Sequence, residues 1–357
     1  MRLSELRIEN LRVVSESTLV LPAGWSVFVG PNGAGKTSLL EAVFLLSHGR
    51  SFRSASRDTL SRVGGRGFSV FGRIERADGI SHRLGLARNN NRLEARVDGA
   101  DVTLGALVQA CAVVCFEPGS HELINGAADG RRRYLDWGVF HVEHEFLDDW
   151  RRYQRALRQR NVLLREGAAD QELDPWEAEM AASGERLSRY RADYVEQLRP
   201  ILQEILGTFL GELGEPVLVF EPGWSGPQAL SAALRDGRSR DRDRGHTGRG
   251  PHRADWSVGF ARAPRREHLS RGQEKLCALA FVLAQARLHA VRCGEWPILC
   301  FDDLASELDR AHLAVVLEVA RNSGAQVLMT GTEVPAALAG AGCDATVFHV
   351  EHGCVTP

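Results

Sequence analysis

The fold is decided by residues 30–37, Gly30-Pro31-Asn32-Gly33-Ala34-Gly35-Lys36-Thr37. They match the P-loop pattern, in which a glycine is followed after four residues by Gly-Lys and then by Ser or Thr. The apolar run Trp25–Val29 before them predicts a buried strand, and Thr37–Leu46 after them predicts a helix that is apolar on nearly every side. In this context the backbone N–H groups at the helix start bind phosphate. The stretch therefore predicts a site for a nucleoside triphosphate.

The residues of this loop have distinct expected roles. The Lys36 ammonium can reach the β- and γ-phosphates, and the Thr37 hydroxyl can coordinate Mg2+. The glycines let the backbone approach the phosphates closely. We expect the nucleotide-binding set to comprise Gly30, Asn32, Gly33, Ala34, Gly35, Lys36, Thr37 and Ser38.

A second pattern lies far along the chain, where Pro297–Phe301 predicts a buried strand that ends at Asp302 and Asp303. Ligands of open parallel sheets bind at the carboxyl ends of the strands. We therefore expect Asp302 to hold Mg2+ and Asp303 to orient or deprotonate the water that attacks the nucleotide. Lys36 and Asp303 are the predicted catalytic residues.

A third pattern, Leu269-Ser270-Arg271-Gly272-Gln273, directly precedes an apolar helix. Ser270 can cap this helix, with Gln273 or Glu274 completing a capping box. A helix N-terminus also attracts anions, so the capping role and a role in nucleotide binding are compatible.

The composition bounds the class of protein. The 357 residues are 44% hydrophobic and 25% charged, which excludes wholesale disorder and fibrous folds and favours two globular domains. The formal net charge of −2 gives no overall electrostatic argument for nucleic acid, so any such site must be a local basic patch. The seven cysteines are scattered and several lie in apolar runs, which predicts reduced thiols in a cytoplasmic protein. We expect neither a signal peptide nor a membrane segment.

The patterns predict an α/β fold with a discontinuous core. Alternating segments from Phe68 to Val102 predict an antiparallel subdomain, and the later strand–helix–strand rhythm predicts a parallel sheet, so the core sheets are mixed. Residues 121–209 show helical periodicity without a strong strand signal. We therefore expect a core of residues 1–120 and 210–357 around an all-helical inserted domain of residues 121–209. The Arg/Asp/Gly-rich stretch 235–253 predicts a solvated loop.

The order of the three patterns resembles that of ABC-type ATPases. Residues 269–273 are similar to the signature motif of these proteins, and residues 306–309 are similar to their D-loop. Gly331 stands where many members carry a switch histidine, which implies slow, switch-like hydrolysis of ATP.

Further stretches resemble the RecF family, which is related to the SMC and Rad50 heads. They are residues 6–12, 48–53, 129–136, 159–164 and 247–255, the last with Ala254 where the family pattern has Asp. The resemblance runs from residue 1 to about residue 335.

The resemblance implies a homodimer that forms when two ATP molecules are sandwiched between subunits. Each ATP would lie between Lys36 of one subunit and Ser270, Gly272 and Gln273 of the other. Arg12 is implied as an ATP contact. The implied ligand is duplex DNA near a single-strand gap or junction, where RecR and RecO help to place RecA in repair, recombination and replication.

Arginines supply the candidate DNA contacts, although each of them can instead pair with nearby acids. The candidates are Arg50, Arg53, Arg131, Arg132, Arg133, Arg249 and Arg253. The cluster at 131–133 can equally pack the insertion against the core, and His252 can be a catalytic group or a loop hydrogen-bonder.

Three other functions share the nucleotide motifs. The nucleotide-binding subunit of a membrane transporter usually has its signature much closer to the P-loop and carries a switch histidine. The head of a chromosome-organising complex carries a far longer arm than residues 121–209 can form. A toxin-defence ATPase of the same superfamily usually carries an added nuclease domain, for which this chain has no room.

Overall fold

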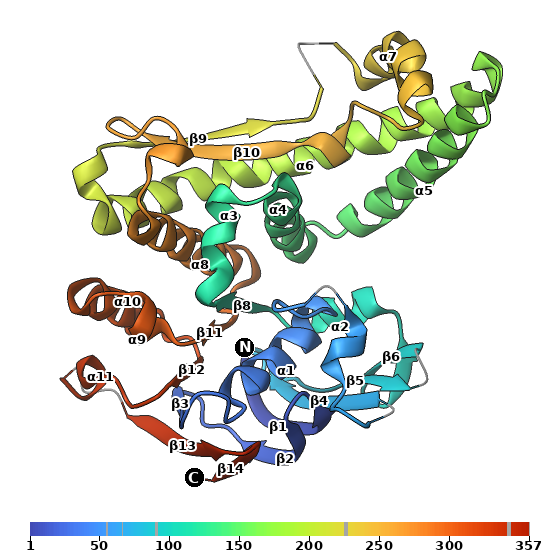
Figure 1. Ribbon diagram of the computed structural model, residues 1–357. Coiled ribbons are helices and arrows are strands. Elements are labelled where there is room, and N and C mark those ends of the chain that lie inside the picture. The colour runs from blue at the N-terminus through green and yellow to red at the C-terminus, as the bar shows by residue number, and fades with distance from the viewer. Residues whose placement is uncertain (55, 66, 90–91, 225–227, 341–343, 357) are drawn as a thin grey trace. The chain divides into compact units, whose positions relative to one another are not determined.

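The computed structural model describes residues 1–357 except 55, 66, 90–91, 225–227, 341–343 and 357 (Figure 1). It divides into two compact units, residues 1–120 with 278–357, and residues 121–277. The first boundary coincides with the predicted one. The second falls at Cys277 and not at residue 209, so the unit that interrupts the core is longer than expected.

The first unit contains an antiparallel sheet near the N-terminus. Within the described residues its strand order is β2-β1-β4-β5-β6-β7. The predicted segments between Phe68 and Val102 form its last four strands. The strands are β1 (Arg2–Leu11), β2 (Val14–Val20), β4 (Gly67–Glu75), β5 (Ser81–Asn89), β6 (Arg92–Val97) and β7 (Ala100–Val102).

The second sheet of this unit is mostly parallel. Its order over the described residues is β14-β13-β3-β12-β11-β8, and only β14 runs antiparallel to its neighbour. The strands are β3 (Trp25–Val29), β8 (Val113–Phe116), β11 (Ile298–Phe301), β12 (Val327–Gly331), β13 (Ala345–Glu351) and β14 (Cys354–Thr356). The helices of the unit are α1 (Lys36–His48), the 3-10 helix η1 (Arg57–Leu60), α2 (Leu104–Ala110), α9 (Leu304–Glu307), α10 (Arg310–Ser323) and α11 (Ala336–Gly340).

Helix α1 is the centre of this unit, as its all-round apolar sequence predicts. Eleven of its 13 residues are buried. One core cluster joins Leu40 of α1 to Ile8 of the antiparallel sheet and Leu328 of the parallel sheet. A helix that is hydrophobic on every side must be covered on every side. The N-terminus of α1, where the P-loop ends, is therefore fixed by packing against both sheets.

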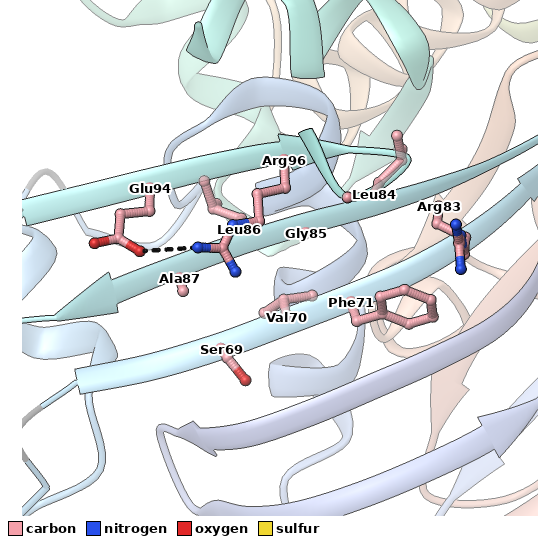
Figure 2. Close-up of a pocket in the computed structure, with 11 residues that line it drawn as sticks. Ser69, Val70, Phe71, Arg83, Leu84, Gly85, Leu86, Ala87, Glu94 and Arg96 are labelled. Carbon is pink, nitrogen blue, oxygen red and sulfur yellow. Dashed lines mark ion pairs between the residues drawn. The ribbon is translucent and has the colours of Figure 1, made fainter. Parts of the chain in front are cut away.

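The antiparallel sheet carries a shallow hollow on the face opposite this core. The hollow has a volume of 320 Å³ and lies over Gly85 and Ala87 of β5. Figure 2 shows Phe71 on one side of these small residues and Arg96 on the other, with Arg96 3.9 Å from Glu94 in an ion pair. None of the predicted nucleotide-binding residues lines it.

The second unit is built around two long helices. Helix α5 (Phe146–Arg165) and the 40-residue α6 (Asp170–Phe209), about 60 Å long, run side by side (Figure 1). The other helices of the unit are α3 (Glu122–Asn125), α4 (Ala128–Val142) and α7 (Leu230–Arg244), with 3-10 turns η3 (Gly211–Leu213), η4 (Pro251–Arg253) and η5 (Arg266–His268). Another 3-10 turn, η2 (Pro118–His121), lies at the first boundary, and α8 (Arg271–Cys293) crosses the second.

The second unit is not all-helical. The expectation holds for residues 121–209, but β9 (Pro216–Glu221) pairs antiparallel with β10 (Asp255–Phe260) inside this unit. The two strands pair with each other and belong to neither sheet of the core. Both strands lie within residues 210–357, which the sequence analysis places in the core. This part of the prediction is wrong because the strand pattern of a segment does not reveal its partner strand.

The predicted loop at 235–253 is wrong over its first half, because α7 extends to Arg244. Its charges pair with buried groups on the neighbouring helices. Arg238 contacts Glu177 of α6 at 2.6 Å, and Asp241 lies 2.7 Å from the fully buried Arg160 of α5. The alternation of Arg and Asp therefore serves helix packing, and the charges do not simply face solvent.

Helix α8 is long and apolar enough to cross a membrane by length and composition. However, 72% of its apolar window is buried within the protein. Core helices share this property.

His252 holds the loop after α7 in place. Its Nε2 lies 3.0 Å from the Thr247 carbonyl oxygen, which can only accept, so Nε2 carries the proton. Its Nδ1, 2.7 Å from Tyr153 Oη, then accepts from the phenol. Both nitrogens are engaged inside this unit, which favours the loop-bonding role over a catalytic one.

The His252 environment makes stability depend on pH. Burial lowers the pKa of His252 from 6.5 to about 4. Between these pH values the unfolded chain binds a proton that the folded chain does not, so the folded state loses stability as the pH falls. From pH 7.5 to pH 5 we expect wild type to lose about 2 kcal/mol more than His252→Gln in urea unfolding. An equal loss in the two proteins would contradict the assigned neutral imidazole.

Candidate nucleotide-binding site

The P-loop connects β3 to α1 in a backbone shape that needs glycine at two positions. A Cβ atom at Gly30 would lie 2.1 Å from the carbonyl oxygen of Val350 in β13, which no side chain tolerates. Gly35 caps α1 with φ 112° and has no side-chain capping bond. The first turn of the helix therefore presents its backbone N–H groups without competition from a side chain, as a phosphate site requires.

Lys36 is folded into this loop. Its ammonium Nζ donates to the carbonyl oxygens of Gly30 at 2.8 Å and Pro31 at 3.1 Å. Only 4% of the residue is exposed. The positive charge is thus held within the loop that receives the phosphates.

The tertiary fold brings the P-loop to the end of β11, 265 residues away in sequence. The Thr37 hydroxyl donates to Asp302 Oδ1 at 3.0 Å, and the Thr330 hydroxyl donates to the same oxygen at 2.7 Å. Burial raises the pKa of Asp302, and the bonds from Thr330 and Thr37 act in the opposite direction. A hydroxyl beside a carboxylate is the hard oxygen donor set that suits Mg2+, so these residues fit the predicted metal site.

Asp303 lines the same pocket as the P-loop. This pocket has a volume of 480 Å³. Its walls include Arg12, Asn32, Gly33, Gly35, Lys36, Thr37, Ser38, Arg53 and Asp303. Gly30 and Ala34 of the predicted set do not line it. Both belong to the buried side of the loop: Gly30 lies close to the Val350 carbonyl, and the Ala34 side chain is buried.

A buried carboxylate that the sequence analysis did not identify holds Arg12 directly and Arg53 through Ser51, and both arginines line this pocket. Glu41, one turn into α1 and fully buried, accepts from Arg12 Nε at 2.9 Å and Nη2 at 2.7 Å. The Ser51 hydroxyl donates to the same carboxylate and accepts from the Arg53 N–H at 2.9 Å. The one available signal was a charged residue within an otherwise apolar helix, which points to a buried partner.

The signature stretch begins α8 in the second unit. Ser270 Oγ accepts from the Gln273 N–H at 3.3 Å, and Gln273 Oε1 accepts from the Ser270 N–H at 2.9 Å. This is the reciprocal capping box that the sequence predicts. Ser270 and Gly272 are exposed, so the capped helix start faces solvent in the single chain.

The structure contradicts a DNA contact for Arg131. This residue is 2% exposed, and its guanidinium donates to both Asp255 oxygens, at 2.6 and 2.9 Å, and to the Gly126 carbonyl at 2.7 Å. A buried guanidinium with these partners supports the second unit from inside.

The other candidate arginines differ in exposure. Arg132 donates to the Ala254 carbonyl at 2.9 Å and is partly buried, as are Arg50 and Arg249. Arg53, Arg133 and Arg253 are exposed, and Arg133 pairs with Asp129 at 2.6 Å. The exposed three are the candidates that a polyanion can reach without rearrangement.

The Glu41 cluster can be tested by its energetics. We expect Glu41→Gln to lower the free energy of unfolding by about 3 kcal/mol, because it leaves the Arg12 charge poorly compensated. Ser51→Ala should cost only about 1 kcal/mol, because the Arg12–Glu41 pair remains. Urea unfolding measures both. Equal losses would show that the Arg12–Glu41 charge pair is not the main contribution.

Known proteins resemble this chain over nearly its whole length. It is 47% identical to DNA replication and repair protein RecF of Xanthomonas euvesicatoria pv. vesicatoria (strain 85-10), over 100% of this chain and 98% of that protein. It is 36% identical to the protein of the same description from Stutzerimonas stutzeri (strain A1501), over 100% of this chain and 97% of that protein.

Solved structures agree with these relatives. The recombination mediator protein RecF-ATP in the RecFOR pathway matches with a TM-score of 0.89 at 25% identity, over 99% of this chain and 96% of that chain. An Smc head bound to the C-winged helix domain of ScpA matches with a TM-score of 0.62 at 14% identity, which shows a shared fold alone. The family of RecF/RecN/SMC N-terminal domains matches residues 2–355. The chain therefore belongs to the RecF family of DNA replication and repair proteins and has the ABC-type ATPase fold.

Proposed function

We propose that this chain is an ATP-dependent DNA-binding protein of recombinational repair and replication. It binds duplex DNA near single-strand gaps as an ATP-clamped homodimer, and it helps RecO and RecR to load RecA. The observation that carries the proposal is one pocket lined by Lys36, Thr37 and Asp303, with Asp302 bonded to Thr37, in a chain whose relatives are named for DNA repair.

The pocket supports hydrolysis of ATP. The P-loop N–H groups and Lys36 bind the phosphates, and Thr37 and Asp302 would hold Mg2+, which supplies neutralisation of phosphate charge when bound. The oxygen of a water molecule attacks the γ-phosphorus, the bond to the β–γ bridging oxygen breaks, and the electron pair leaves with ADP. Asp303 accepts the proton of the water. Gly331 offers no imidazole to this reaction, so we expect slow turnover suited to a switch.

The clamp uses a second copy of the chain. The nucleotide pocket is bounded by residues of the first unit, and the exposed capped start of α8 presents N–H groups and the positive end of a helix dipole. The Ser270, Gly272 and Gln273 stretch of a partner subunit would complete the site around the γ-phosphate. ATP binding then closes the dimer and hydrolysis opens it.

The DNA contacts fall to the exposed arginines. Arg53, which also lines the nucleotide pocket, Arg133 and Arg253 are accessible in the single chain, and two copies double their number in a dimer. Because the net charge of the chain is −2, attraction to phosphate depends on such local groups. Binding should therefore weaken steeply as the salt concentration rises.

A structural head of a chromosome-organising complex is the second candidate. The shared fold with the Smc head favours it. The end-to-end match to relatives at 36% to 47% identity favours the repair function instead. The α5–α6 pair, with α6 only about 60 Å long, is also short for such an arm.

Fluorescence anisotropy of a gapped duplex tests the clamp. With ATP and Mg2+ we expect wild type to bind at least about 10-fold more tightly than Lys36→Met, which removes the ammonium that holds the phosphates. Arg92→Met is the matched control, because it removes an exposed cation from β6, far from the P-loop in sequence. An affinity for the gapped duplex that is the same with and without ATP, or the same in Lys36→Met as in wild type, would reject an ATP-gated clamp.

Dimer formation tests the role of the signature. Ser270→Arg should leave ATP binding by the single subunit intact and abolish the ATP-dependent dimer, because the long side chain blocks the approach of the partner. Light scattering with and without ATP measures this. The lost helix cap costs about 1 kcal/mol, too little to unfold the chain. Ser257→Arg, at an exposed serine of β10, is the control, and an unchanged dimer in Ser270→Arg would reject the shared site.

A further inference from the structure

Thr330 occupies the end of the strand next to the acidic pair. Strands β11 and β12 are parallel, and their register pairs Phe301 with Met329. The next residues along the two strands are Asp302 and Thr330, so the register alone brings them together. Thr330 is 1% exposed, and its side chain is enclosed at this position.

The Thr330 hydroxyl bonds to both acidic residues at once. Its Oγ1 lies 2.7 Å from Asp302 Oδ1 and 2.9 Å from the backbone N of Asp303. The N–H of Asp303 can only donate, so Oγ1 accepts that bond with a lone pair. The single hydroxyl proton is then available for the Asp302 carboxylate. The one donor of the Thr330 hydroxyl and one of its two lone pairs are therefore used by the two acidic residues.

Asp303 has a backbone conformation that needs such support. Its φ of 49° and ψ of 32° lie in the left-handed region, which is unfavourable for a residue with a Cβ atom. Thr330 holds its N–H, and Ser306 donates to its carbonyl oxygen from the backbone N at 2.9 Å and from Oγ at 2.7 Å. The carboxylate makes no capping bond to α9 and lines the nucleotide pocket. Hydrogen bonds therefore fix the backbone N–H and C=O of Asp303, and its carboxylate remains available to a ligand in the pocket.

We propose that Thr330 is a positioning residue for ATP hydrolysis, which aims the Asp303 carboxylate at the nucleotide pocket while it fixes Asp302 beside Thr37. The proposal rests on the hydrolytic role given above to Asp303. Thr330 does not line the pocket, so it acts through the two acids and not through contact with ATP. Its loss should therefore slow hydrolysis and leave nucleotide affinity nearly unchanged.

Thr330→Val tests this, because valine keeps the shape of threonine and removes only the hydroxyl. We expect ATP affinity, measured by titration with a fluorescent ATP analogue, to stay within about 2-fold of wild type. We expect kcat to fall by about 10- to 100-fold, because misplacement of a reacting group by about 1 Å can slow a reaction by about 100-fold. Thr330→Ser restores the hydroxyl and should return kcat to within about 3-fold of wild type.

Thr332→Val is the matched control, because it makes the same change at an exposed threonine two residues further on. It should behave as wild type. Thr330→Val with wild-type kcat would overturn the proposal, and so would an equal loss of affinity and kcat or a failure of Thr330→Ser to recover activity. Asp303→Asn distinguishes a failure of the role proposed for Asp303 from a failure of the role proposed for Thr330. If Asp303→Asn hydrolyses ATP normally, the role of Asp303 is wrong; if it is inactive while Thr330→Val is normal, only the role of Thr330 is wrong.

Discussion

One buried carboxylate oxygen, Asp302 Oδ1, joins the three segments on which the nucleotide site depends. It accepts from Thr37 of the P-loop and from Thr330 of β12, and it belongs to the residue that follows β11. Burial disfavours the charged carboxylate, and hydrogen bonds to it restore part of the lost solvation. A shift of either neighbouring segment would leave this acid without one of its donors.

The packing of α1 makes this junction possible. Because the helix is enclosed by both sheets, its N-terminus cannot move without disturbing the common core. The P-loop therefore meets the end of β11 at a fixed distance. Glu41 also fixes residues outside the helix. It accepts hydrogen bonds from Arg12 and Ser51 and so holds both to the helix that begins with Lys36 and Thr37.

Arginine serves two purposes in this chain. In the second unit Arg131 and Arg160 are buried, and each forms an ion pair with one or more carboxylates. Removal of one partner from such a pair is far more costly than loss of a surface charge, so these arginines maintain the shape of the unit. Arg53 and Arg253 are exposed and keep the charge accessible to a polyanion. The two groups of arginines therefore differ in burial, which residue type alone does not reveal.

Local patterns were sufficient for most of the fold. The P-loop, its flanking strand and helix, the antiparallel segments after Phe68 and the helical character of residues 121–209 agree with what motifs and periodicity predict. Each of these features depends on neighbours in the sequence, through 2.0- or 3.6-residue repeats or through the glycines of a tight loop. The pairing of β9 with β10 and the helical state of α7 were missed, because both depend on partners distant in sequence.

The site divides in the same way. The sequence by itself determined the phosphate loop, the acids at the end of β11 and the capping box at Ser270, because each is a short motif with its own local chemistry. Only the tertiary structure decided that Glu41 holds Arg12, that Thr330 bonds to both acids and that Arg131 is buried. The physical reason is that a hydrogen bond requires two groups within about 3 Å and an ion pair requires them within about 4 Å, and the fold alone brings residues from distant segments that close.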